Sequence, residues 1–172
     1  MYRHLEFAPS RAVIIFFGLL VHQTIEDIHR RTLDGRGSEI NEAFISERFE
    51  FNFRHLVQRE ARKIGQEQKQ AALNQIMNYW RQNAEAIARV QETEVDVSLE
   101  KDDYILNGAI DLVLGDDNQL EVLDFKAQKR PAPDHPMIKT YYQQLCIYAH
   151  ILEERKKIRP SKLHIYWTGE AD

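Results

Sequence analysis

The stretch Gly108–Lys126, GAIDLVLGDDNQLEVLDFK, decides the fold and raises the first chemical question. Two apolar runs flank the polar segment GDDN, and this pattern predicts two antiparallel strands joined by a hairpin turn. Each run carries one aspartate, Asp111 or Asp124, and Lys126 follows two places after the second. Strands that are built for burial rarely carry charged side chains, so these three residues need a chemical explanation.

The predicted hairpin brings the two aspartates together. A turn centred on Asp117 and Asn118 pairs Asp111 directly with Asp124, and strand alternation puts Lys126 on the same face as Asp124. Adjacent carboxylates repel each other and are costly to bury, unless a divalent cation such as Mg²⁺ or Mn²⁺ lies between them. A neighbouring lysine then suits a phosphate group. Spacing alone leaves open a simpler interpretation, with two aspartates in solvated turns and an exposed lysine.

Working outward from the hairpin, we expect helices before it and a helix and a strand after it. The expected helices span 10–33, 39–64, 66–90 and 137–158, and the expected strands span 92–99, 104–115, 119–127 and 162–169. This order predicts an α/β (α+β) fold with a mixed central sheet of about four strands flanked by helices. The helix between the last two strands acts as a crossover, so those two strands could be parallel.

Length and composition favour one ordinary globular domain over 1–172, with a mainly helical part over 1–91 and a sheet core over 92–172. The net charge of −4 means that nucleic-acid binding would need a local basic groove or metal ions. The single cysteine, Cys146, excludes a cysteine-ligated iron–sulfur cluster and favours a reducing compartment, so we expect a cytoplasmic location. The apolar run 12–21 is about half the length that a membrane-spanning helix needs, so no membrane partner is expected.

Three motifs resemble one enzyme family. IDLVL followed by EVLDFK resembles the active-site hairpin of the PD-(D/E)XK nuclease superfamily, in which an aspartate strand precedes a D/E-x-K strand. GLLVH, ending at His22 on the first expected helix, resembles the first motif of the RecB-like branch of that superfamily. QQLCIY contains its Q-x-x-x-Y motif, because Gln144 and Tyr148 lie four residues apart and so share one helix face. Taken alone, a histidine that ends an apolar run is more often a core residue.

The resemblance implies a restriction-endonuclease-like core and a specific set of site residues. As metal ligands it implies His22, Asp111, Asp124 and the backbone carbonyl of Phe125. As the catalytic set it implies Asp111, Asp124, Lys126 as the catalytic lysine, and Gln144 and Tyr148, which would orient the site or contact DNA. The glutamate that some relatives carry before the aspartate strand could be Glu92 or Glu94. A metal face formed by His22, Glu26 and His29 is a further alternative on helical spacing.

Other residues are suited to DNA contacts. The candidates are Lys129, Arg130, Lys139 and Tyr141. For the charged loop that holds the first two, a purely solvated role is an equal alternative.

The function that the resemblance implies is a Mg²⁺- or Mn²⁺-dependent DNA nuclease, most simply an exonuclease, in a helicase–nuclease system of DNA repair or recombination. The sequence has no G-x-x-x-x-G-K-[ST] loop, so an ATP-dependent helicase motor would lie elsewhere in a longer chain or in a partner protein. One alternative is a DNA-binding module of the same fold that cuts weakly or not at all. Another is a structural interaction domain in which the motif matches are coincidental.

Overall fold

The computed structural model describes residues 9–60, 64–101, 104–115 and 119–170. Its helices are α1 (Pro9–Leu33), α2 (Glu42–Glu60), α3 (Gln66–Gln82), the short α4 (Ala84–Ala88) and α5 (Pro136–Lys156), with 3-10 turns at Gly37–Glu39 and Thr168–Glu170. Its strands are β1 (Val90–Lys101), β2 (Tyr104–Gly115), β3 (Leu120–Lys126) and β4 (Lys162–Trp167).

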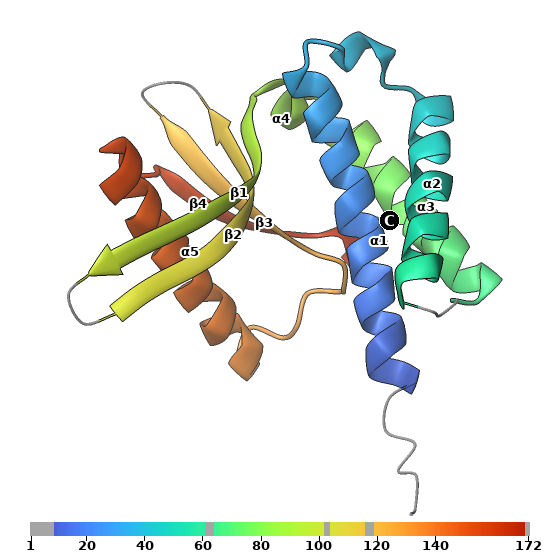
Figure 1. Ribbon diagram of the computed structural model, residues 1–172. Helices are drawn as coiled ribbons and strands as arrows, with labels where there is room; N and C mark the ends of the chain where they lie inside the picture. Colours follow the sequence, from blue (N-terminus) through green and yellow to red (C-terminus); the bar gives the residue numbers. More distant parts are fainter. Residues whose placement is uncertain (1–8, 61–63, 102–103, 116–118, 171–172) are drawn as a thin grey trace, which may run out of the picture.

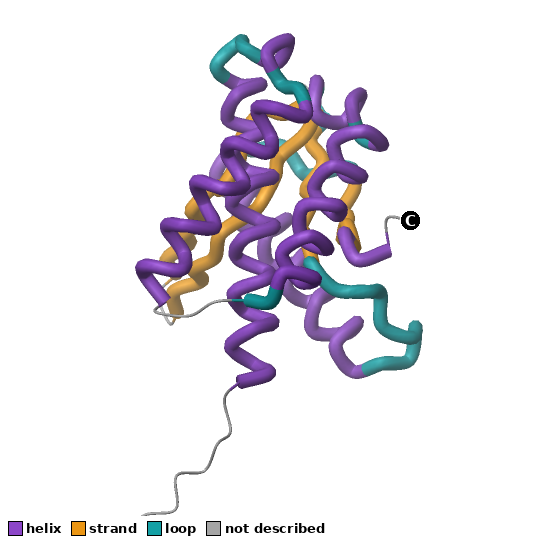
Figure 2. The backbone as a smooth tube through the Cα atoms, turned by 90° about the vertical axis from the view of Figure 1, so that its right-hand side faces the viewer, coloured by secondary structure: helices purple, strands orange, loops and turns teal. Residues whose placement is uncertain are grey.

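The four strands form one sheet in the order β1-β2-β3-β4. The β1–β2 and β2–β3 pairs are antiparallel, whereas β3 and β4 are parallel neighbours connected through α5. Helices α1 to α4 lie on one side of the sheet and α5 covers the other (Figures 1 and 2). The expected mixed α/β fold, with a helical region at the start of the chain, is therefore confirmed.

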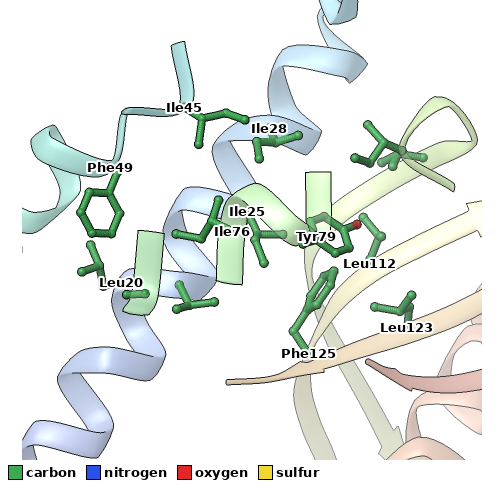
Figure 3. Packing of buried hydrophobic residues seen from close by; sticks show 14 of the residues in the cluster. Leu20, Ile25, Ile28, Ile45, Phe49, Ile76, Tyr79, Leu112, Leu123 and Phe125 are labelled. Atoms are coloured by element: carbon green, nitrogen blue, oxygen red, sulfur yellow. The ribbon is translucent and has the colours of Figure 1, made fainter. Parts of the chain in front are cut away.

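Each face of the sheet has its own apolar core. Alternating side chains of β3 divide between the two cores, because Leu123 and Phe125 face the helical side while Leu120 and Val122 face α5. Figure 3 shows the first core, where α1, α2 and α3 meet β2 and β3. The site residues at the end of β3 are thus anchored from both sides of the sheet.

The predicted hairpin register is confirmed. Leu112 pairs with Leu123 and Val113 with Val122, and the same register continued by one residue sets Asp111 opposite Asp124. The residues expected at the centre of that turn, 116–118, lie outside the described residues, as do 102–103 in the turn expected before β2.

The helix expected over 66–90 is divided by a break at Asn83, because α3 covers Gln66–Gln82 and α4 covers Ala84–Ala88. The helix expected over 39–64 is described as Glu42–Glu60, and residues 61–63 of that prediction lie outside the described residues. Helix α3 ends at Gln82, a single turn of helix follows, and β1 begins at Val90. Asn83 marks the break: its side-chain amide donates to the Tyr79 carbonyl and to the Tyr166 hydroxyl, both at 2.9 Å. Because Tyr166 belongs to β4, this break depends on a tertiary contact that local sequence does not reveal.

Candidate active site

Asp111 lies where β2 and β3 separate. The paired positions end at Leu112 and Leu123, and one step further the Asp111 carboxylate accepts a hydrogen bond from the Phe125 backbone N–H at 2.6 Å. A side chain therefore takes the place of a backbone partner at this end of the sheet. The contact holds the Asp111 carboxylate over the end of β3, beside Asp124.

Asp124 is almost fully buried, with 3% of its surface exposed. Its Oδ1 accepts a long hydrogen bond of 3.4 Å from the Gln144 side-chain amide. Its Oδ2 accepts no hydrogen bond from any described residue, although the Lys126 ammonium lies 2.6 Å away in a poorly aligned position. The ammonium offsets part of the cost of burying this carboxylate, and a bound divalent cation would offset the repulsion that remains between Asp124 and Asp111.

The Q-x-x-x-Y pair of α5 reaches the same carboxylate. The Gln144 amide donates to the Tyr148 hydroxyl at 2.6 Å as well as to Asp124. The Tyr148 ring lies against Gly108 of β2, where a Cβ atom would be only 2.6 Å from the ring carbon Cε1. Gly108 therefore supports the site indirectly, a role that sequence reasoning missed even though this glycine begins the hairpin stretch.

His22 approaches the hairpin from α1. Its Nδ1 lies 3.8 Å from Asp111 Oδ2, and its ring meets the Phe125 ring edge-on with 6.2 Å between centroids. The alternative metal face that includes His29 is wrong. His29 is 1% exposed, its Nε2 hydrogen-bonds the Tyr79 hydroxyl at 2.8 Å, and burial lowers its pKa to about 3. This histidine is a neutral core residue.

Glu94 is the second residue that sequence reasoning did not place. Its neighbours Thr93 and Val95 pair with Leu112 and Ile110, the two residues that flank Asp111. Glu94 lines a hollow of about 390 Å³ together with His22, Glu26 and Asp111. Burial, followed by the charges of Asp111 and Glu26, raises the pKa of the Glu94 carboxyl to about 7. Burial also raises the pKa of Asp111; His22 opposes that rise, and Asp124 adds to it. Glu92, the other candidate, instead pairs with Lys156 on the surface.

The donor set fits a hard divalent cation. Carboxylate oxygens of Asp111 and Asp124 are the ligand type that Mg²⁺ and Mn²⁺ prefer, and their repulsion disappears when a cation is bound. Within the part of the chain that the structure describes, no group of three or more His, Cys, Asp or Glu side chains is already arranged around one metal position. Ligands beyond the two aspartates would therefore have to move or be supplied by backbone and solvent.

The residues predicted to contact DNA divide into two groups. Tyr141 lies at the site, because the Lys126 ammonium is 4.9 Å from its ring centroid, and the Trp167 ring packs against it at 5.6 Å. Lys129 and Lys139 are exposed. Arg130 is engaged by Glu170, which its guanidinium contacts at 3.1 Å. Tyr141 is thus the member of this set for which a contact with the catalytic-lysine candidate Lys126 is found among the described residues.

The sequence also matches a known family over almost its whole length. The family model described as the PD-(D/E)XK nuclease superfamily matches residues 3–170. The chain belongs to this superfamily. Its members are usually nucleases that bind nucleic acid and use divalent metal ions. No curated protein matches the chain, and none of the helices in the described ranges is long and apolar enough to cross a membrane.

Proposed function

We propose that this superfamily member is a Mg²⁺- or Mn²⁺-dependent deoxyribonuclease that hydrolyses phosphodiester bonds at the end of the β2–β3 hairpin. The observation that carries the proposal is the Asp124 carboxylate. It is buried, its Oδ2 forms an ion pair with the Lys126 ammonium at 2.6 Å, and its charge acts on the neighbouring Asp111, one step beyond the last β2–β3 pair. Lys126 compensates one of the two neighbouring carboxylates, and a bound divalent cation would remove the repulsion that remains between Asp124 and Asp111.

The side chains divide the work. Asp111 and Asp124 would hold the ion, with His22 and the Phe125 carbonyl as the further ligands that the family motif implies. A divalent cation bound there supplies Lewis acidity, which lowers the pKa of a bound water and neutralises phosphate charge. The Lys126 ammonium stabilises the negative charge that develops on the phosphate oxygens. Gln144, braced by the Tyr148 hydroxyl, fixes the orientation of the Asp124 carboxylate.

The narrower parts of the proposal rest on the other motifs. Gly18–His22 on α1 and the Gln144–Tyr148 pair on α5 support assignment to the RecB-like branch. Membership of that branch would support exonuclease action on DNA ends, performed beside an ATP-dependent helicase in DNA repair or recombination. This sequence has no phosphate-binding loop, so a motor of that kind would belong to a partner or to another part of a longer protein.

A second candidate is a DNA-binding module of the same fold that cuts weakly or not at all. One observation favours it: among the described side chains, no metal group of three or more is arranged in advance. All residues of the D…D-x-K motif are nevertheless present, and the loss of one of them would be the simplest mark of such a module. The nuclease therefore remains our leading proposal.

The test is cleavage of labelled DNA by the wild type, Asp124→Ala and Lys126→Ala, in Mg²⁺, in Mn²⁺ and in EDTA. Linear single strands, linear duplexes and circular molecules of the same sequence separate exonuclease from endonuclease action. We expect metal-dependent cutting of linear DNA by the wild type and a loss of at least a hundredfold in both variants. Ala43→Leu changes an exposed position of α2 and is the matched control, because it should cut DNA like the wild type. Binding of DNA by the wild type without cutting in any metal would favour the binding module.

A further inference from the structure

A largely apolar pocket of about 440 Å³ opens beside the candidate active site. One wall is the beginning of α1, and the other is the end of β3 with the two residues that follow it. The lining includes Val13, Ile14, Phe17, Phe125, Ala127 and Gln128. Because His22 and Lys126 also line this pocket, it is continuous with the site.

Hydrolysis of a phosphodiester bond does not need an apolar pocket. The pocket has the size of a small-molecule site, which is typically about 300–1,000 Å³. It combines apolar and aromatic walls with Lys126 among its lining residues, and this combination matches a nucleotide, whose flat base is joined to an anionic phosphate. Stacking of an unpaired base on an aromatic side chain contributes about 1–3 kcal/mol, and every base has a face that can stack.

Gly18 leaves the pocket open toward the second hollow. This glycine lies inside α1, where glycine costs about 1 kcal/mol relative to alanine. A Cβ atom built on it meets nothing within 4 Å in the described chain outside its own helical turn, so packing does not require a glycine here. Gly18 lines both the apolar pocket and the acidic hollow of Glu94 and Asp111. The missing side chain therefore leaves a gap across α1 between the two.

We propose that the apolar pocket receives one unpaired base of the substrate strand, whose backbone passes over α1 at Gly18 with a phosphate near Lys126. This inference rests on the proposed nuclease function and names its substrate class: single-stranded DNA or a frayed end, rather than an intact duplex. A base inside a duplex is stacked and paired, and removing it costs a few kcal/mol. Ile14, which also lines the pocket, has 65% of its surface accessible and so offers apolar area to a bound base.

The direct test is the fluorescence of 2-aminopurine placed at successive positions in short single-stranded oligodeoxynucleotides, measured with the full chain in EDTA so that nothing is cut. We expect a saturable change in fluorescence at one position near an end. Gly18→Leu should weaken this binding at least tenfold without lowering the melting temperature, because leucine is the better helix former. Gly18→Ala should bind the oligonucleotide with an affinity between those of the wild type and Gly18→Leu, and Ala43→Leu should bind like the wild type. No response at any position, or an equal response in Gly18→Leu, overturns the inference.

Cleavage distinguishes failure of the pocket from failure of the nuclease. In Mg²⁺ or Mn²⁺ the wild type should cut a single strand at least tenfold faster than the same sequence in a blunt duplex. Equal rates on both substrates contradict the base pocket and leave the nuclease proposal intact. If the wild type cuts neither substrate, the nuclease proposal fails, and the fluorescence experiment still decides whether the pocket binds a base. A pocket that is filled by another segment of the chain would give no fluorescence response and would also overturn the inference.

Discussion

Replacing Gly108 with alanine should damage the site from a position that touches none of its charged groups. The new Cβ would lie 2.6 Å from Tyr148 Cε1, whereas ordinary contacts are 3.4–4 Å, so the ring must move by about 1 Å. Overpacking of this kind costs about 1–3 kcal/mol. Removing a glycine from a strand returns about 0.5–1 kcal/mol, so we expect a net loss of about 1–2 kcal/mol in the free energy of unfolding.

The same displacement should reach the chemistry. The Tyr148 hydroxyl holds the Gln144 amide, and that amide contacts Asp124 Oδ1 at the limit of a hydrogen bond, 3.4 Å. A ring shifted by about 1 Å carries the hydroxyl with it, so the Gln144 contact with Asp124 is the first to break. In the proposed nuclease, we expect Gly108→Ala to lower the cleavage rate more than tenfold while the protein stays folded.

A double-mutant cycle measured by urea denaturation isolates the cause. Gly108→Ala should destabilise the wild type by about 1–2 kcal/mol but should have no cost, or a small gain, in a Tyr148→Ala background where the ring is gone. Gly37→Ala is the matched control, because its Cβ would meet Thr32 atoms no closer than 3.7 Å. If Gly108→Ala costs the same in both backgrounds to within about 0.5 kcal/mol, the ring contact is not the reason and the reasoning is refuted.

Three further changes test the site and the core beside it. Burial, with the charges of Asp111 and Glu26, raises the pKa of Glu94 from 4.5 to about 7. Between these two values the metal-free folded state holds a proton that the unfolded chain has lost, so the free energy of unfolding falls as pH rises through this window. In urea unfolding at successive pH values, the free energy of unfolding of Glu94→Gln should fall less with rising pH than that of the wild type. An equal fall in the two proteins would contradict the raised pKa of Glu94. His29→Leu leaves the Tyr79 hydroxyl unpartnered and should cost about 1–3 kcal/mol by thermal unfolding. Asp111→Asn should abolish calorimetric heat of Mn²⁺ binding, and unchanged heat would remove this aspartate from the ligand set.

Local sequence was sufficient to predict the hairpin and which side chains meet at its end. The polar turn has a definite length, and strand alternation has a period of two, so the position of the turn fixed the pairing of Leu112 with Leu123 and of Val113 with Val122. The same alternation put Lys126 on the face of Asp124, where the two groups meet. Helical spacing likewise predicted that Gln144 and Tyr148 would share a face, and their side chains are hydrogen-bonded.

Features that depend on contacts between distant segments could not be predicted in this way. The helix break at Asn83 requires Tyr166, which lies in another element of the fold. The need for glycine at position 108 becomes visible only when α5 places Tyr148 over β2. A glycine in a strand indicates a bulge or a close approach, but the sequence does not say which group approaches.

Glu94 shows why the acidic side of the site was the hardest part to predict. It reads as an ordinary strand residue, yet its φ of 49° lies in the left-handed region, a conformation that costs a non-glycine residue about 1–3 kcal/mol. The β1–β2 register also shifts between Val90 and Glu92, just before it. The strained backbone places the half-buried Glu94 carboxyl near Asp111, where the negative charge of Asp111 makes ionisation of Glu94 less favourable. A cation bound at Asp111 would relieve that repulsion, so Mn²⁺ should raise the melting temperature of the wild type more than that of Glu94→Gln. Equal shifts in the two proteins would show that Glu94 contributes nothing to the electrostatics of the metal site.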